Sequence, residues 1–273
     1  MEATHLPRGL DIGRPTPSRM RDYILRGPHY FDADADAAER ILGIVPEIRD
    51  TVWATRGFHQ RAVAWLAKRG IRQFLDIGCG LPSVGNTHEV AQREQAGAHV
   101  VYVDTDPLVE LFGDLPESPA GAVGIIRADP REPDAVMDHP VVRDLIDPAK
   151  PTGLLLTSTM SFIPDSSGPW DLTARYVRRV APGSYLALSH LTGDAKPPAA
   201  MAGCRTVLDA ATEHIHFRSK GEIARFFNGL DLIPPYAGAR PELAYGGIWG
   251  AEDVTLADSE GSRWLYCGVA KVP

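Results

Sequence analysis

The sequence predicts an α/β fold built around a mostly parallel sheet. Three observations support this prediction: short apolar runs alternate with helical stretches from Gly70 onward, Gly and Pro separate the runs, and a glycine turn follows the first of them. Such alternation is typical of βαβ units, in which a helix returns the chain to the same edge of the sheet. We expect residues 1–70 to form a helical cap and residues 71–273 to form the rest of the same domain.

The first 70 residues have helical periodicity. Ser18 can cap an opening helix, and a longer helix is expected from about 48 to 68, ending at Gly70. Between them, apolar side chains recur at helical spacing before Pro46, at Ala37, Ala38, Ile41, Leu42 and Val45. These helices are expected to precede the sheet.

Seven strands and six helices are expected after the cap. The segment 234–262 is rich in Gly and Pro and is interpreted as an irregular connection or a hairpin. The strands are expected at 73–77, 99–104, 124–128, 153–159, 184–190, 229–233 and 264–270. The helices are expected at 86–95, 107–112, 134–145, 171–180, 200–213 and 220–227.

Composition narrows the range of partners and compartments. The net charge of −7 and the pI near 5.7 provide no basic surface for phosphates, so a nucleic-acid partner is not expected. The three cysteines have no CxxC spacing, which favours a reducing cytoplasm over a disulfide framework or a zinc ribbon. The sequence has neither an apolar stretch typical of a secretion signal near Met1 nor a run long enough to span a membrane, so a soluble protein is expected.

The first predicted strand runs into FLDIGCG at 74–80. Gly78 and Gly80 allow a tight turn and let the backbone approach a ligand with no Cβ in the way. Asp76 can reach the cationic amino group of a methionine-bearing cofactor, whereas its charge would repel a pyrophosphate. Cys79 is either a thiol activated by a helix N-terminus or simply a small residue between two glycines.

Two further acids follow the next two predicted strands. Asp104 can accept hydrogen bonds from both ribose hydroxyls, a role found in NAD-binding and S-adenosylmethionine-binding sheets alike. Asp129 can accept a hydrogen bond from an adenine amino group. Each acid alone could instead cap a helix or a turn. Their joint placement with Asp76 after three successive strands favours a ligand site, with Thr105 as a neighbour of Asp104.

The chain resembles the actinobacterial S-adenosyl methyltransferases formerly catalogued as a domain of unknown function. The resemblance implies a seven-stranded Rossmann-like sheet, mostly parallel with one antiparallel strand and with helices on both faces. It also implies that S-adenosyl-L-methionine is bound in 71–273 and released as S-adenosyl-L-homocysteine. The matching segments are SRMRDYILRG at 18–27, FLDIGCGLPSVGNTHEVAQ at 74–92, VVYVDTDPLV at 100–109, HPVVRDLID at 139–147, APGSYLALSH at 181–190 and RSKGEIARFFNGLDLIPP at 218–235.

The sequence departs from the family pattern near the acceptor. Cys79 replaces the usual threonine, which should leave the glycine loop intact. RGPHYF at 26–31 replaces a Gly-Gly-Lys-Asp-Asn-Phe run, and Ser161 replaces a frequent histidine, so the acceptor is expected to differ from that of typical relatives. Thr55 and Arg56 replace an Asn-Arg pair. Arg56 can still pair with the methionine carboxylate, although a surface salt bridge is the alternative.

The resemblance suggests a small-molecule acceptor, methylated on oxygen, nitrogen or electron-rich carbon. An aromatic or peptide-like specialised metabolite is expected, and a homodimer remains open. The candidate cofactor contacts are Tyr23, Arg56, Asp76, Gly78, Cys79, Gly80, Asp104, Thr105, Asp129 and Ser158. The candidate acceptor contacts are His29, Tyr30, Phe162 and Trp170, of which Phe162 could equally be a core residue.

Methyl transfer from a sulfonium is a direct displacement, so a catalytic base is optional. If the acceptor is a hydroxyl, His190 is the preferred base because it ends the fifth predicted strand. The alternative is that His190 satisfies a backbone carbonyl. His214 and His216 could suggest a metal, but no third ligand stands at a typical spacing and no metal is expected.

Three alternatives to a methyltransferase differ in how well the sequence fits them. A nicotinamide-dependent oxidoreductase shares the glycine turn, but Ser83 stands where its third glycine or alanine is needed and no Tyr-x-x-x-Lys occurs. A non-catalytic S-adenosylmethionine-binding protein differs from an enzyme only in its acceptor pocket. A hydrolase is disfavoured because no GxSxG elbow is present.

Overall fold

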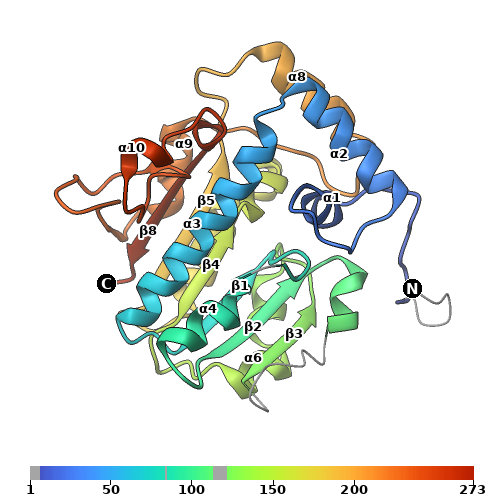
Figure 1. The fold of residues 1–273 in the computed structure, drawn as a ribbon. Helices are drawn as coiled ribbons and strands as arrows, with labels where there is room; N and C mark the ends of the chain where they lie inside the picture. Colours follow the sequence, from blue (N-terminus) through green and yellow to red (C-terminus); the bar gives the residue numbers. More distant parts are fainter. Residues whose placement is uncertain (1–6, 84, 113–121) are drawn as a thin grey trace.

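The computed structural model describes residues 7–83, 85–112 and 122–273, which form a three-layer α/β arrangement (Figure 1). Its central sheet contains eight strands in the order β3-β2-β1-β4-β5-β8-β6, with β7 also paired to β8. The strands are β1 (Gln73–Ile77), β2 (His99–Asp104), β3 (Val123–Arg127), β4 (Gly153–Thr157), β5 (Tyr185–Leu191), β6 (Asp231–Leu232), β7 (Ala244–Tyr245) and β8 (Leu265–Lys271).

The strand directions confirm the predicted mostly parallel sheet. β1 to β5 pair in parallel, whereas β8 is antiparallel to β5, β6 and β7. Among the described strands β8 is therefore the one that runs against the others. The expected number of seven was one too low, because the two-residue β7 lies in the segment interpreted as irregular or hairpin. β4 also ends before the predicted limit of 159, since Ser158 has a left-handed φ of +66°.

Helices cover both faces of the sheet (Figure 1). The predicted helix 134–145 is divided in two, because Pro140 starts a new helix that the His139 side chain caps. No described helix is long and apolar enough to cross a bilayer. The α-helices are α1 (Pro17–Ile24), α2 (Asp32–Ile44), α3 (Ile48–Lys68), α4 (Thr87–Glu94), α5 (Pro133–Met137), α6 (Pro140–Leu145), α7 (Pro169–Arg178), α8 (Pro198–Leu208), α9 (Lys220–Ala224) and α10 (Val254–Ala257). The 3-10 helices are η1 (Pro107–Phe112), η2 (Thr159–Phe162), η3 (Asp165–Ser167), η4 (Arg225–Phe227) and η5 (Ser262–Trp264).

The sheet is buried on both faces, which explains its nearly continuous apolar strands. In β1, Leu75 and Ile77 belong to one core cluster, while Phe74 belongs to the cluster on the opposite face. On that opposite face α3 contributes the fully buried Phe58 and Leu66. Each such large apolar side chain contributes about 1.5–3 kcal/mol when it leaves water.

The N-terminal helices lie over the carboxyl ends of the strands. α2 packs beside α8, and α1 lies between that pair and the ends of β1 to β3 (Figure 1). A separate apolar cluster joins these elements, with Met20 of α1, Ile41 of α2 and Leu208 of α8 among its members. The helical cap is thus attached to the edge of the sheet where the three acids were predicted.

Candidate active site

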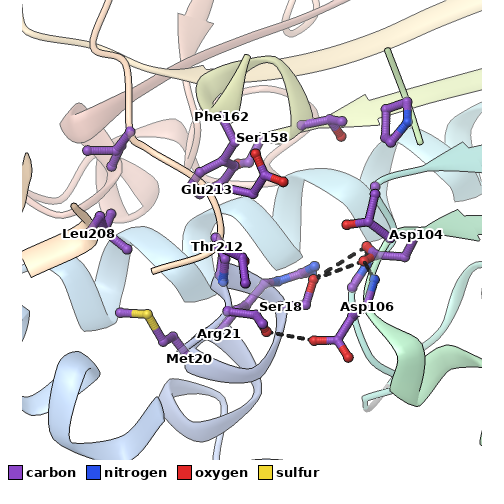
Figure 2. Close-up of a pocket in the computed structure, with 18 of the residues that line it drawn as sticks. Ser18, Met20, Arg21, Asp104, Asp106, Ser158, Phe162, Leu208, Thr212 and Glu213 are labelled. Atoms are coloured by element: carbon purple, nitrogen blue, oxygen red, sulfur yellow. Dashed lines mark hydrogen bonds between the residues drawn. The ribbon is translucent and has the colours of Figure 1, made fainter. Parts of the chain in front are cut away.

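A cavity of about 410 Å³ lies between the carboxyl ends of the strands and the N-terminal helices (Figure 2). It has two chemically different ends. One end is polar and adjoins the ends of β1 to β3, where Ser18, Arg21 and Asp104 lie together (Figure 2). The other end is apolar and is lined by Met20, Ile24, Ile41, Ile48, Val52, Phe162, Ile163, Leu191, Cys204, Leu208, Ile215 and Phe217.

The glycine turn forms the floor of the polar end. Gly78 and Gly80 have φ values of +69° and +70°, which side chains other than glycine rarely adopt. A Cβ on Gly78 would lie 2.5 Å from the Thr159 hydroxyl, and one on Gly80 would lie 3.0 Å from a guanidinium nitrogen of Arg21. The turn is fixed by the Gly78 N–H, which donates to the carbonyl of Val103 at 2.7 Å. Both glycines are therefore favoured by conformation, and Gly78 is also required by space.

Asp104 ends β2 and lines the cavity together with Thr105. Its carboxylate accepts hydrogen bonds from the Gly80 N–H at 2.8 Å, the Asp106 N–H at 3.0 Å and the Ser18 hydroxyl at 3.2 Å. Burial raises the pKa of Asp104, and these donors oppose the rise. The Ser18 contact comes from α1, so the cap reaches the carboxylate that was predicted to bind ribose.

Asp76 lies in a small pocket of about 20 Å³ that shares Gly80 with the main cavity. Such a space holds one group of about the size of a water molecule. One carboxylate oxygen of Asp76, Oδ2, accepts from the Thr87 hydroxyl at 2.6 Å, whereas the buried Oδ1 has no hydrogen-bond partner in the described chain. Burial raises the pKa of Asp76 to about 6. An unpartnered carboxylate oxygen in a pocket of this size fits a cationic amino group.

Two arginines stand close to Asp76. Arg56, which was predicted, lines the same small pocket, and burial lowers its pKa to about 10. Arg21 was not predicted as a site residue, although it lies within the SRMRDYILRG segment. It lines the main cavity and donates to the Cys79 carbonyl at 3.1 Å, while its buried Nε has no partner in the described chain. These guanidinium groups can pair with a carboxylate beside the acid pocket.

Three other predicted cofactor contacts, Asp129, Ser158 and Cys79, line the main cavity or the small pocket. Asp129 lines the main cavity, where Arg131 binds it with N–O distances of 2.6 and 2.9 Å. Partial burial opposes ionisation of Asp129, but Arg131 outweighs it and the pKa falls below its usual value. Ser158 also lines the cavity. Cys79 faces the small pocket instead, and burial raises the pKa of its thiol, so the structure does not support an activated thiolate.

His190 is not placed to act as a base in this cavity. Its side chain is fully buried and is not among the residues that line the cavity. The ring nitrogens face the carbonyls of Leu191 and Met160, and the guanidinium of Arg218 also contacts the ring. Burial and the charge of Arg218 lower its pKa to about 3. This geometry matches the alternative in which His190 satisfies a backbone carbonyl, since the neutral ring has a single N–H to donate.

The predicted aromatic contacts divide into two groups. Phe162 lines the apolar end of the cavity, whereas Tyr23, His29, Tyr30 and Trp170 do not line it. Tyr23 donates to Glu39 at 2.6 Å and makes an edge contact with Tyr30. Trp170 lies in another part of the fold, where it stacks on Phe226, and His29 packs against Phe112. The structure therefore does not support acceptor contacts by Tyr30, His29 and Trp170, or a cofactor contact by Tyr23.

Besides Arg21, two further residues that the sequence did not single out lie in or directly behind the candidate site. Glu213 lines the main cavity (Figure 2), and burial raises its pKa while the charge of Arg131 opposes the rise. His59 of α3 is buried behind the strand ends and contacts hydroxyl groups on both sides. His214 lies 3.4 Å from Asp209, and the described residues include no group of three or more side chains suited to a metal.

One glycine turn follows β1, and an acid lies at or near the end of each of the three parallel strands β1, β2 and β3. Together with the single reversed strand near one edge of the sheet, these features define a Rossmann-like enzyme for a nucleoside cofactor. Comparisons with known proteins identify the family. The S-adenosyl methyltransferase family model matches residues 3–273. The chain belongs to this family and is an S-adenosylmethionine-dependent methyltransferase, as the sequence resemblance predicted.

Two solved structures support the assignment. A Thermobifida fusca protein assigned to the methyltransferases shares 31% identity, covers 99% of each chain and superposes with a TM-score of 0.88. A DUF574 family protein from Streptomyces avermitilis shares 32% identity over 96% of this chain and 99% of that chain, also with a TM-score of 0.88. A search of curated proteins finds no match.

Proposed function

We propose that the chain transfers the methyl group of S-adenosylmethionine to an oxygen or nitrogen atom of a small, largely apolar acceptor molecule. The observation that supports this proposal is the two-part cavity. Its volume of about 410 Å³ falls within the range of roughly 300–1,000 Å³ that is typical of small-molecule sites. The polar end suits a nucleoside and an amino-acid group, so the apolar end between α1, α2, α3 and α8 is left for the acceptor.

The proposed cofactor placement follows the charges of the polar end. Asp104 would accept the ribose hydroxyls, with Thr105 beside it, and Asp129 would face the adenine amino group. Asp76 would hold the methionine ammonium through its unpartnered oxygen. Arg21, together with Arg56, would pair with the methionine carboxylate, since both guanidinium groups lie near Asp76.

The bound cofactor supplies a methyl group on a positively charged sulfur. The protein must align the acceptor with that methyl group and exclude water, which the apolar walls can do. An O–H or N–H acceptor also has a proton to lose. We assign that proton to the carboxylate of Glu213, because Glu213 lines the cavity and burial raises its pKa, which makes its carboxylate a stronger proton acceptor than an exposed one.

We further propose that residues 1–70 act as a cap within one domain. The cap carries Ser18 and Arg21 to the strand ends and provides Met20 and Ile41 for the acceptor side. The described cysteines, Cys79, Cys204 and Cys267, are free thiols, which supports the expected cytoplasmic location. An acceptor of this size and polarity is a metabolite rather than a nucleic acid.

Calorimetric titration tests the proposal. S-adenosylmethionine and S-adenosylhomocysteine should bind in the micromolar range, and NAD should not bind. The acceptor class is then tested with a panel of phenols and aromatic amines, each compared with a matched carboxylic acid. Labelled methyl should be transferred from the cofactor to the phenols or the amines and not to the acids. Binding of NAD in place of the sulfur ligands would overturn the cofactor placement, and transfer confined to the acids would overturn the acceptor class.

A further inference from the structure

A continuous row of hydrogen bonds runs behind the cofactor site through His59. The ring Nε2 of His59 lies 2.7 Å from the Thr87 hydroxyl, which donates at 2.6 Å to Oδ2 of Asp76. The ring Nδ1 lies 3.1 Å from the hydroxyl of Thr157. His59, Asp76, Thr87 and Thr157 come from α3, β1, α4 and β4, and each is at most about 5% exposed.

The hydrogens of this row have a single consistent direction when Asp76 is ionised. The Thr87 hydroxyl has one hydrogen, and the carboxylate of Asp76 can only accept it. Thr87 must therefore accept the hydrogen on Nε2 of His59. A neutral imidazole then leaves Nδ1 as an acceptor, so the hydroxyl of Thr157 points its hydrogen at His59. Burial, with the charges of Arg56 and Arg21, lowers the pKa of His59 well below its usual value, which keeps the ring neutral.

Both ends of the row consequently offer electron pairs. Asp76 presents Oδ1, which has no partner in the described chain. Thr157 lines the main cavity, and because its hydrogen is directed at His59, its oxygen can only accept from a group in that cavity. β1 and β4 are neighbouring parallel strands, paired at Asp76 and Leu155, so the two acceptors lie at adjacent strand ends.

We infer that His59 is a positioning residue that orients Asp76 and Thr157 as a pair of acceptors for the methionine ammonium group of the cofactor. This inference rests on the proposed cofactor placement. His59 itself touches neither the acceptor nor the methyl group. An ammonium group has three N–H donors, enough for an acceptor in the small pocket and another in the main cavity, and the two cavities share Gly80.

The test compares two ligands that share the nucleoside and differ at the amino-acid end. S-adenosylhomocysteine and adenosine are titrated calorimetrically into wild type and into His59→Phe. We expect the affinity for S-adenosylhomocysteine to fall about tenfold or more, as for a lost contact to a charged group, and that for adenosine to change less than about threefold. His59→Gln, whose amide can donate to Thr87 and accept from Thr157, should restore most of the loss.

Threonine variants supply the matched comparison. Thr157→Val and Thr87→Val should show the same ligand-selective loss. Thr173→Val should not, because Thr173 is an equally buried threonine on α7 that donates within its own helix, to the carbonyl of Pro169 at 3.0 Å. These variants also keep the inference testable if His59→Phe does not fold, which thermal melting would reveal.

Each outcome decides a separate question. If wild type binds neither ligand, the cofactor placement fails. If wild type binds S-adenosylhomocysteine but the His59 and Thr157 variants lose both ligands equally, or lose neither, only the positioning role of His59 fails. A selective loss that His59→Gln reverses supports the role, because a purely structural contribution would affect both ligands.

Discussion

Asp76 is deeply buried, and its Oδ1 has no hydrogen-bond partner in the described chain. Although Arg56 and Arg21 lie nearby, the negative charge of Asp76 is therefore poorly stabilised until the ammonium group of the cofactor binds. The pKa of Asp76 is raised from 3.8 to about 6, mainly by burial. The folded chain therefore binds this proton more tightly than the unfolded chain does. The stabilising contribution of the protonated form is complete below about pH 4 and is lost as the pH rises through 6. At neutral pH the ionised group opposes folding.

Asp76→Asn should therefore stabilise the unliganded protein at pH 7.5. The displacement of the pKa from 3.8 to about 6 sets an upper bound of ~3 kcal/mol on the gain, at ~1.4 kcal/mol for each pH unit. Urea denaturation at pH 7.5 measures the gain, and it should vanish at pH 4. The same variant should bind S-adenosylhomocysteine at least tenfold more weakly. A loss of stability at pH 7.5 would contradict the argument.

Cofactor affinity should depend on pH through the same carboxyl group. Between pH 7 and pH 5 the affinity for S-adenosylhomocysteine should fall by up to about tenfold, because Asp76 must lose its proton to hold the ammonium. The groups that act on Asp76 are Arg56, Arg21, Thr87 and Asp104, and Asp104 also has a raised pKa. Adenosine serves as the control, since its binding involves Asp104 and Asp129 but not Asp76, and the pKa of Asp129 is lowered and lies outside this range. If adenosine shows the same fall, Asp104 is the titrating group.

Glu213 can be tested separately from cofactor binding. Glu213→Gln should lower kcat by about 10²–10⁴ for the best phenol or amine of the panel, because the amide cannot take the proton. Affinity for S-adenosylhomocysteine should remain within about threefold of wild type. The measurement is the rate of transfer from labelled cofactor against pH. Unchanged kcat at every pH would exclude Glu213 as the base.

The sequence predicted the candidate site residues at the strand ends and Arg56 of α3, but it did not predict Arg21, His59 and Glu213, which reach the candidate site from elsewhere. Asp76, Asp104 and the glycines were predictable, since the ends of parallel strands meet at one edge. His59 was not, because it lies on an apolar helix face and its partner Thr157 is 98 positions away. His190 lies one residue before the end of β5, close to the predicted strand end, but its ring turns to backbone carbonyls, and the sequence does not show which way a side chain turns.

At the scale of elements, α1 is the link between the cap and the cofactor site. Its Arg19 is about 1% exposed and lies 3.4 Å from Asp34 of α2 and 3.3 Å from Asp106 after β2. The Thr16 hydroxyl that precedes α1 donates to Asp106 at 2.6 Å. This buried group fixes α1 in the position that brings Ser18 to Asp104. The sequence pattern around α1 did not predict this buried group, because Arg19, Asp34 and Asp106 are far apart in the sequence.

Removing the cation of this group should weaken the fold. Arg19→Ala leaves Asp34 and Asp106 buried without their counter-charge, and we expect a loss of about 3–5 kcal/mol in the free energy of unfolding. Arg178→Ala is the control, since its ion pair with Asp171 on α7 is exposed and should contribute less than about 1 kcal/mol. Urea denaturation measures both. Hydrogen exchange should also speed up first in α1, and uniform exchange would argue against a local link.

At the scale of the molecule, the sequence predicted the sheet better than it predicted the cavity. Alternating apolar runs indicated the parallel sheet, and the family resemblance indicated its one reversed strand. The apolar end of the cavity was not predictable, because α1, α2, α3 and α8 meet there through contacts between distant segments. Of the aromatic side chains predicted to contact the acceptor, Phe162 lines the cavity, whereas Tyr30 and Trp170 pack against other rings.

The place of β8 has a consequence for how the chain is made. β8 is the last described strand, yet it lies inside the sheet between β5 and β6. A ribosome that adds about 5–20 residues per second exposes β5 seconds before its partner emerges. During that interval β5 presents an unpaired edge, the kind of surface on which nascent chains associate. Completion of the sheet around β5 therefore waits until β8 has been made, and a chain that stalls before Leu265 is more exposed to aggregation and to chaperones than one that contains β8.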